Sequence, residues 1–438
     1  MHSILAQLDL LEPFRTEIAW RIIVVGALTN VACALVGCYL VLRRMSLMGD
    51  AIAHAVLPGL VLAFLFSGSM NILPLFIGAA AVGLLTTFLT QTLHQYGRVP
   101  ADASMGAVFT SLFALGVVLL KRYITGVHFD VACVYEGSLM QGALDTIFVG
   151  GVELPRQLIT IGPVVLLNLA VILLLWKELK LSSFDAALAT TIGYSATALH
   201  YLLMALVAVT SVASFEAVGS ILVVAMLIVP PSTAHLLCDR LGRMVVVACI
   251  FAVLAAVVGY WFAHTWNVSP AGAMAVAAGG MYALAVLLSP QYGILSTLAR
   301  NLQTSLRILR EDLLAMLFRV EELGGRPLEA DMAVAAVGGG WQARWALSTL
   351  KRRGRIDAAA KDGLRLTADG RERAKRLVRG HRLWEAFLVK HLGLPLDHVH
   401  EPAHRVEHFI NQPLRDELQK ELDAQQDPHG RVIPDFRL

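Results

Sequence analysis

Hydrophobic residues form long, nearly unbroken runs over roughly the first 290 residues of this chain and short periodic groups after them. Many of the runs are close to the ~20 residues that a helix needs to cross a bilayer. The pattern therefore predicts eight or nine membrane-spanning helices, at about 18–41, 51–68, 72–93, 102–120, 157–176, 197–213, 216–237, 244–263 and 270–289.

Two segments depart from this simple pattern. In 131–150, the polar residues Glu136 and Asp145 interrupt the apolar run, which indicates a re-entrant or interfacial piece rather than a full crossing. In 211–237, the pair Pro230-Pro231 lies deep in an apolar run. A break there would line a cavity, act as a hinge or end a span early.

After Pro290 the periodicity becomes that of amphipathic helices. Residues 305–325 predict one such helix, ended by two glycines, and a second helix, a triple-glycine turn, a third helix and a short two-stranded wing follow. This is the outline of a winged helix-turn-helix. We therefore expect a membrane domain at 1–295, a winged-helix domain at 296–370 and a helical metal-binding and dimerisation domain at 371–438.

Composition indicates two parts of the chain, one embedded in lipid and one surrounded by water. The chain is 56% hydrophobic and only 16% charged, too apolar for an ordinary soluble protein of 438 residues. Roughly two-thirds of the charged residues follow Arg300. The fold class is thus an all-α polytopic membrane protein with a polar C-terminal domain. The five cysteines form no CxxC pair and are interpreted as small hydrophobic residues.

Basic residues indicate which ends of the spans face the cytoplasm. They gather at three places, whereas the loops 67–71, 210–214 and 264–268 are nearly uncharged. By the positive-inside tendency this alternation predicts a cytoplasmic C-terminal domain. The basic residues are Arg43, Arg44, Lys177, Lys180, Arg240 and Arg243.

A group of metal-ligand side chains lies near the C-terminus. His400, His404, Glu407 and His408 are spaced i, i+4, i+7 and i+8, which stacks three imidazoles and a carboxylate on one face of a helix. These ligand types suit a divalent transition metal such as Mn, Fe, Co or Zn. A polar, solvated helix face is the alternative.

A second His/carboxylate pair precedes this group by about twenty residues. His381 and Glu385 are spaced i, i+4 and therefore share a helical face. Two such groups close in sequence favour a metal site over a solvated face, because they bring together six residues of ligand type.

The membrane part carries its own polar pair. Asp50 and His54 lie one turn apart at the start of an apolar segment, where polar groups are costly and tend to mark a permeation path. Alternatively, Asp50 caps the helix that follows Gly49 and His54 is a hydrogen-bonded histidine of the bundle. Spacing leaves both interpretations open.

Two stretches of the membrane part resemble a known family. SLMGDAIAHAVLPG and SFEAVGSILVVAMLIVPPSTA are similar to the signature stretches of the zinc/manganese/iron permease family of ABC importers, and the likeness covers roughly residues 15–290. It implies a multi-pass permease of the bacterial cytoplasmic (inner) membrane, in a homodimer or heterodimer of permease subunits. An extracytoplasmic metal-binding protein would feed this pore, and Asp50 and His54 would touch the passing ion.

The resemblance also implies a transporter subunit rather than an enzyme, with ATP hydrolysed on a separate ATP-binding subunit. The chain has no GxxxxGK[ST] phosphate loop, in agreement with no nucleotide bound here. Residues 180–199 resemble the segment by which such permeases contact their ATPase, which assigns that coupling to Asp185, Ala187 and Gly193. An ordinary amphipathic connector is the alternative for this segment.

Residues 305–434 resemble metal-dependent repressors of the diphtheria-toxin-repressor and manganese-regulator kind. The likeness rests on HRLWE, VHEPAHRVEH and DPHGRVIP in the family's order. It implies one ligand set of His381, Glu385 and His400, and another of Asp312, His404, Glu407 and His408.

Two positions depart from the repressor pattern. His404 occupies a position that is usually Cys or Glu, and Ala315 stands where manganese-selective members have a second carboxylate. The surplus of nitrogen donors favours Fe, Co, Ni or Zn over manganese.

The predicted second helix of the helix-turn-helix offers possible DNA contacts at Gln342, Arg344, Lys351 and Arg352. A solvated helix end with basic residues explains them equally. The tail is therefore either a metal sensor that regulates uptake or a membrane-tethered, metal-dependent DNA-binding transcription regulator. The triple glycine and the pair Trp341/Trp345 are unlike a DNA-reading helix and favour the sensor.

Overall fold

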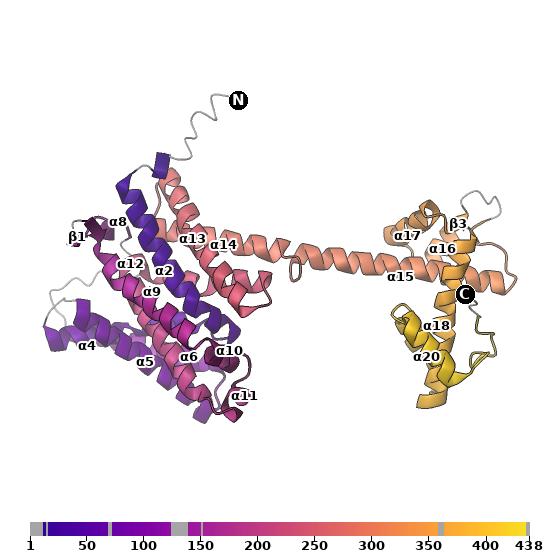
Figure 1. Ribbon diagram of the computed structural model, residues 1–438, viewed down its shortest axis with the longest axis horizontal. Helices are drawn as coiled ribbons and strands as arrows, with labels where there is room; N and C mark the ends of the chain where they lie inside the picture. The colour runs from indigo at the N-terminus through magenta and orange to yellow at the C-terminus, as the bar shows by residue number, and fades with distance from the viewer. Residues whose placement is uncertain are drawn as a thin grey trace. The chain divides into compact units, whose positions relative to one another are not determined.

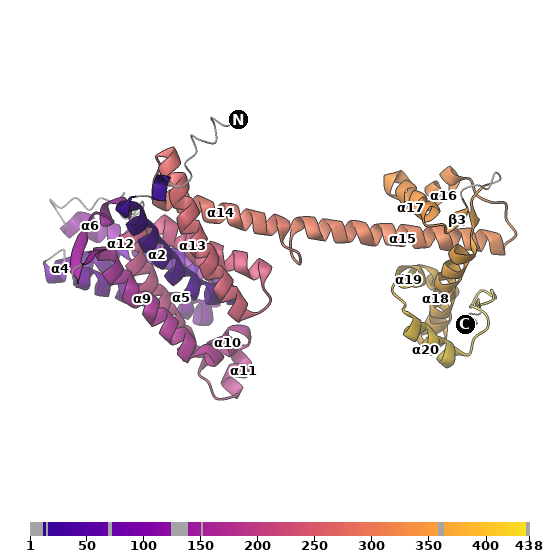
Figure 2. The same ribbon diagram turned by 45° about the horizontal axis from the view of Figure 1, so that its top comes forward.

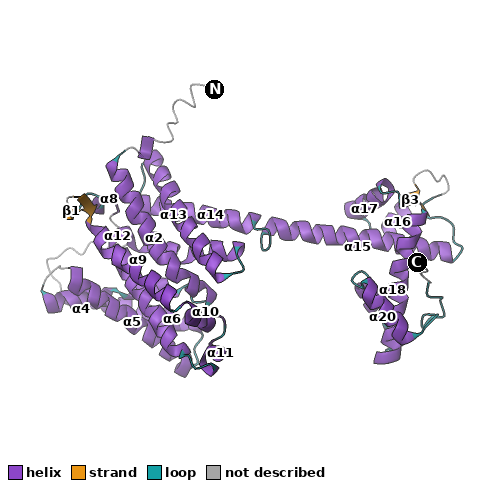
Figure 3. Cartoon of the chain, in the orientation of Figure 1, coloured by secondary structure: helices purple, strands orange, loops and turns teal. Residues whose placement is uncertain are grey.

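Figure 1 presents the computed structural model, which describes residues 12–14, 16–68, 72–123, 139–149, 152–357 and 363–434. Residue contacts divide the chain into two units, Met1–Ser296 and Thr297–Leu438. Most regular structure in the described residues is helical, with strands confined to two short hairpins (Figure 3).

The first unit is a bundle of long apolar helices. Among the described residues, nine helices are long and apolar enough to cross a membrane, as the hydrophobic runs predict. They are α2 (Glu17–Leu42), α3 with α4 (Met48–Ala55 and Leu57–Ser67), α5 (Ile72–Gly97), α6 (Ala101–Tyr123), α9 (Arg156–Leu174), the two halves of α12 (Ala196–Leu237), α13 (Leu241–Trp266) and α14 (Pro270–Leu288). The expectation of a polytopic helical protein is confirmed.

Short elements connect these spans. They are η1 (Glu12–Phe14), α8 (Leu139–Gly142), β1 (Thr146–Val149), β2 (Val152–Pro155), α10 (Trp176–Phe184) and α11 (Ala186–Thr191). The segment expected to be re-entrant or interfacial is described only in part, since 131–138 lie outside the described residues. Its described part forms α8 and β1, which pairs antiparallel with β2.

Helix α12 breaks earlier than its prolines suggest. Its backbone leaves the helical region at Gly219, where φ is 79° and ψ is 163°, and the helix then continues through Pro230 and Pro231 to Leu237. A positive φ of this kind is readily adopted only by glycine. The interruption between the two spans is therefore set by Gly219.

Helix α2 lies at the centre of the first unit, packed on α9, α12 and α13. Figures 1 and 2 show α2, α9 and α12 side by side. A Cβ atom on Gly37 would lie only 2.2 Å from the Leu227 carbonyl oxygen, so glycine permits the close crossing of α2 and α12. Buried Asn168 of α9 donates to Thr210 Oγ1 of α12 at 2.8 Å and joins these helices through a polar contact.

The second unit contains most of α15 (Ile294–Glu322) and the elements after it. These are α16 (Ala330–Ala336), α17 (Gly340–Arg352), β3 (Ile356–Asp357), β4 (Arg365–Leu366), α18 (Ala368–Leu392), η2 (Leu396–His398), α19 (His400–Val406) and α20 (Gln412–Leu422). Leu313 and Leu317 of α15 pack with Leu347 and Leu350 of α17 in one apolar core. Strands β3 and β4 pair antiparallel after the two helices.

Candidate metal centre

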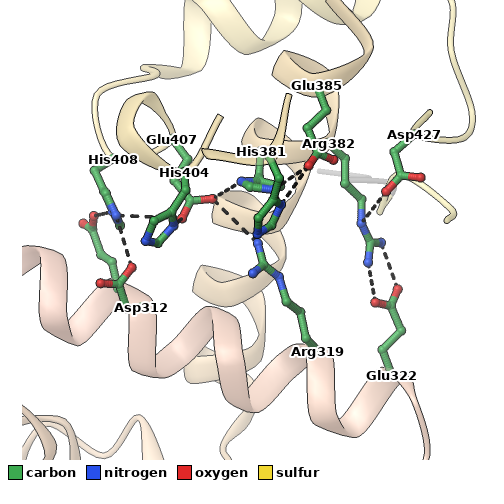
Figure 4. A network of polar contacts seen from close by, with 12 residues as sticks. Asp312, Arg319, Glu322, His381, Arg382, Glu385, His404, Glu407, His408 and Asp427 are labelled. Carbon is green, nitrogen blue, oxygen red and sulfur yellow. Dashed lines mark hydrogen bonds and ion pairs between the residues drawn. The ribbon is translucent and has the colours of Figure 1, made fainter. Parts of the chain in front are cut away.

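Helices α15 and α19 and the turn that follows α19 contribute to a first cluster of ligand side chains, Asp312, His404, Glu407 and His408. One ligand atom from each residue lies within 4.8 Å of all the others. His408 Nε2 is 3.2 Å from Asp312 Oδ1, and His404 Nδ1 is 2.9 Å from Glu407 Oε1. Figure 4 shows Asp312 extending from its helix toward His408. The apolar face of α15, packed in the core, holds that helix in place.

A second cluster joins His381, Glu385 and His400 within the same 4.8 Å limit. Glu385 Oε1 lies 3.0 Å from both His381 Nε2 and His400 Nδ1. His381 and Glu385 are buried in α18, whereas His400 is exposed at the start of α19. This cluster thus has a buried side and a side open to solvent.

One contact joins the two clusters. His381 Nδ1 of the second cluster lies 2.7 Å from Glu407 Oε2 of the first, and both side chains are buried. Arg319 of α15 also approaches Glu407 Oε2, at 3.8 Å. The two clusters are therefore in direct contact through the carboxylate of Glu407.

Charge inside the clusters is balanced between imidazoles and carboxylates. Burial alone disfavours the charged form of His408, but the adjacent carboxylates of Asp312 and Glu311 outweigh this effect and raise its pKa to about 9. Burial raises the pKa of Glu385, yet His381 and His400 together lower it to about 2. A metal ion that binds His408 must therefore displace a proton at neutral pH.

The donor set fits a transition-metal ion. Among the described residues, the buried atoms Asp312 Oδ1, Glu407 Oε2 and His408 Nε2 lack a hydrogen-bond partner of good geometry. Buried polar atoms without partners are costly, and metal coordination would satisfy all three. Mixed imidazole and carboxylate donors suit Mn, Fe, Co or Zn.

Sequence reasoning missed Glu311, which lies 2.9 Å from His408 Nδ1 through its Oε2 atom. Ala315, where a second carboxylate is lacking, is buried in the core of the second unit. Glu311 precedes Ala315 by four residues and so lies near the same face of α15. Helical periodicity could have identified it.

A buried arginine supports the helix that carries His381. Arg382 is 2% exposed and donates to Glu322 Oε1 at 2.9 Å, while its Nε atom lies 3.6 Å from Asp427 Oδ2 (Figure 4). Asp427 in turn accepts from the backbone amides of His429 and Arg431. This network fixes α18 against α15 and the C-terminal turn.

We expect Arg382→Met to lower the free energy of opening at the α18 amides by about 3–5 kcal/mol, because it leaves the buried carboxylate of Asp427 without its cationic partner. Hydrogen exchange of the full chain in detergent measures this quantity. Arg373→Met, at an exposed ion pair with Asp369, is the matched control and should change it by less than ~0.5 kcal/mol. Equal effects of the two substitutions would contradict a supporting role for Arg382.

The polar pair of the membrane unit lies in α3. Asp50 is in the first turn of α3 and makes no helix cap; the N-cap residue is Leu47. His54 Nε2 is 3.4 Å from Asp50 Oδ1, and the His54 ring lies 5.8 Å from that of Phe109 in α6. Both side chains are about one-third exposed. The capping explanation of Asp50 therefore does not describe this geometry.

The segment expected to contact an ATPase is exposed. Asp185 accepts a hydrogen bond from the Leu188 amide at 2.9 Å and caps α11, which contains exposed Ala187. Gly193 follows with a φ of 103°. Three large apolar side chains of this segment are more than 45% exposed: Phe184, Leu188 and Ile192.

The residues considered for DNA contact all lie on α17. Arg344 and Arg352 are exposed, and Gln342 and Lys351 are half-buried. They share this helix with two exposed tryptophans, Trp341 and Trp345.

Comparison with known proteins identifies the membrane unit. Residues 15–289 match the ABC 3 transport family. The chain belongs to this family. Among solved structures, this permease is similar to PsaBC from Streptococcus pneumoniae in complex with Fab, with a TM-score of 0.54 and 28% identity over 66% of this chain and 97% of that one.

Curated relatives of this permease are transport proteins. It is 47% identical over 285 residues to the manganese transport system membrane protein MntD of Bacillus subtilis, covering 65% of this chain and 96% of that protein. It is 38% identical over 274 residues to the zinc transport system membrane protein TroD of Treponema pallidum, covering 63% and 75%.

A second family matches the C-terminal residues. Residues 367–435 match the iron dependent repressor, metal binding and dimerisation domain. Of the seven expected ligands, this match includes every one except Asp312. The chain thus combines an ABC permease with a repressor-like metal-binding domain.

Proposed function

We propose that this chain is the permease subunit of an ABC importer for divalent manganese, zinc or iron, and that its C-terminal domain senses the ion and regulates uptake. The observation that carries the sensing role is the convergence of seven ligand side chains into two adjacent clusters. The named relatives transport manganese and zinc, which supports the choice of cargo.

The proposed importer needs partners. A separate ATP-binding subunit would hydrolyse ATP, an extracytoplasmic protein would deliver the ion, and a second permease subunit, identical or related, would complete the pore. The exposed apolar side chains Phe184, Leu188 and Ile192 support α10 and α11 as the ATPase contact. The basic residues near α2, α10 and α13 support a cytoplasmic position for this contact and for the C-terminal domain.

Regulation would act through the contact between the clusters. A metal ion held by His381, Glu385 and His400, or by Glu407 and its neighbours, competes with the His381–Glu407 contact. Helices α18 and α19 would then adopt one arrangement with the His381–Glu407 contact and another with bound metal. A difference in metal affinity between two such arrangements is what couples metal binding to uptake. A DNA-binding role for α17 is the second candidate, supported by the repressor-family match and by exposed Arg344 and Arg352.

Isothermal titration of the full chain in detergent with Mn, Fe(II), Co and Zn tests the sensing role and ranks the ions. The pore variant Asp50→Ala/His54→Ala serves as background, so that the measured binding belongs to the C-terminal domain. Tight binding in this background supports the proposal. If the C-terminal domain is folded but binds none of these ions, its role would be structural and not sensory.

A prediction about coupling concerns Arg43, at the end of α2. Its guanidinium donates to Ser182 Oγ at 2.9 Å and Ser183 Oγ at 3.1 Å in α10, so it attaches the proposed coupling segment to the chain that leads into α3. Arg43→Gln removes hydrogen bonds from a charged donor, each worth about 1.5–3 kcal/mol. We expect a severalfold loss of ATP-driven uptake in proteoliposomes while ATP hydrolysis persists.

The neighbouring exposed residue gives the control for Arg43. Arg44→Gln changes the same charge without a described contact to α10 and should leave uptake unchanged. If both variants transport like wild type, Arg43 has no part in coupling.

A further inference from the structure

The outer face of α17 combines aromatic and cationic side chains. Its inner face is packed in the core of the second unit through Ala343, Ala346, Leu347 and Leu350. The residues opposite follow the helical spacing i, i+3, i+4, i+7 and i+11. They are Trp341, Arg344, Trp345, Ser348 and Arg352. Trp341 is 64% exposed and Trp345 is 52% exposed, although indole rings are rarely left in water.

A hollow extends this face toward α15. Leu302 of α15 lines an open, mainly apolar hollow of about 470 Å³ together with four residues of the outer face, Trp341, Arg344, Trp345 and Ser348. Leu298, one turn before Leu302, is 63% exposed. The two leucines are spaced i, i+4, so the apolar surface continues from the tryptophans along α15.

The charge of α17 is entirely positive. The helix contains Arg344, Lys351 and Arg352 and no acidic residue, and Arg353 follows it directly. This charge complements the anionic surface of a cytoplasmic leaflet, which attracts each nearby Lys or Arg by about 1 kcal/mol. Tryptophan and arginine are also the side chains that anchor a helix at the headgroup level.

The chain tethers this surface to a membrane-spanning helix. The last span, α14, ends at Leu288, and exposed Leu298 lies only ten residues later. Ten residues reach at most ~35 Å even when extended. A DNA-reading helix, in contrast, presents polar side chains to base edges, and two exposed indoles beside Arg344 hinder such contacts.

From these observations we propose that the outer face of α17, with Leu298 and Leu302, docks on the anionic phospholipid surface of the membrane in which the chain is embedded. The indoles of Trp341 and Trp345 enter the headgroup region, and Arg344 and Arg352 bind lipid phosphates. The metal-binding domain is thereby held at the bilayer. This inference does not depend on which ion is transported or sensed.

Quenching of tryptophan fluorescence tests the docking in the full chain. The emission of the pair is obtained by subtracting that of Trp341→Phe/Trp345→Phe from that of the wild type. We expect this emission to be blue-shifted in nanodiscs containing phosphatidylglycerol and largely lost when the lipid acyl chains carry bromine near the headgroup. In brominated phosphatidylcholine discs the loss of emission should be smaller. In the anionic discs, Arg344→Glu/Arg352→Glu should also make the loss of emission caused by brominated lipid smaller.

Trp384 provides the matched control, because it stacks on Phe387 within α18. The emission removed by Trp384→Phe should be insensitive to brominated lipid. Emission of the Trp341/Trp345 pair that is equally insensitive would overturn the docking. In that case, a response of the pair to a DNA duplex would assign the face to nucleic acid, and a response to permease concentration would assign it to a second copy of the chain.

Discussion

Metal uptake is expected to fall by at least about tenfold when Asp50 or His54 is replaced by alanine, since loss of even an outer partner of a metal ligand costs about 10–100-fold in affinity. The two side chains lie 3.4 Å apart in α3 and are both partly exposed, so an ion passing this helix meets an imidazole and a carboxylate together. Their place in a membrane span, where polar groups are costly, supports a role in the path.

Uptake of radioactive manganese or zinc into proteoliposomes, assembled with the ATP-binding subunit and the external metal-binding protein, measures this effect. His264→Ala, at the exposed end of α13, is the matched control and should transport normally. Each variant is first checked for assembly with its partners. Wild-type uptake by both Asp50→Ala and His54→Ala would remove the pair from the path of the ion.

The second large effect is expected in the C-terminal domain, where His404→Ala/His408→Ala should abolish metal binding by the first cluster. The substitution removes two of its four ligands, and the remaining Asp312 and Glu407 cannot complete a tetrahedral or octahedral site. The affinity should drop by at least about 100-fold. Binding by His381, Glu385 and His400 should persist, so titration should show one ion per chain in place of two.

Two further variants separate this effect from unspecific loss of histidines. His381→Ala/His400→Ala should remove the other ion, whereas His398→Ala, at a side chain 71% exposed and outside both clusters, should bind like the wild type. In the importer, the first-cluster variant should continue uptake at metal concentrations that slow the wild type. A double variant that still binds two ions would exclude the first cluster as a metal site.

The sequence was most informative about features that depend on a single helix. The hydrophobic runs predict eight or nine spans, and nine helices of the described residues are long and apolar enough to cross. The prediction succeeds because the thickness of the bilayer sets a minimum length for each helix, and this requirement does not depend on neighbouring helices. The spacing of His400, His404, Glu407 and His408 likewise predicts a shared face from the helical repeat alone. The break in α12 was harder to predict, because Pro230 and Pro231 look disruptive but the backbone changes direction at Gly219.

The sequence by itself therefore determined the membrane body, the polar tail and the ligand types for a divalent metal. Only the tertiary structure decided that Glu311 contacts His408, that His381 and Glu407 join the two clusters, and that Trp341 and Trp345 face outward. The periodicity of a helix shows which residues share a face, but not which helix packs against that face. The contacts of α15 with α18 and α19 join residues that are far apart in the chain, and local sequence does not encode those distances.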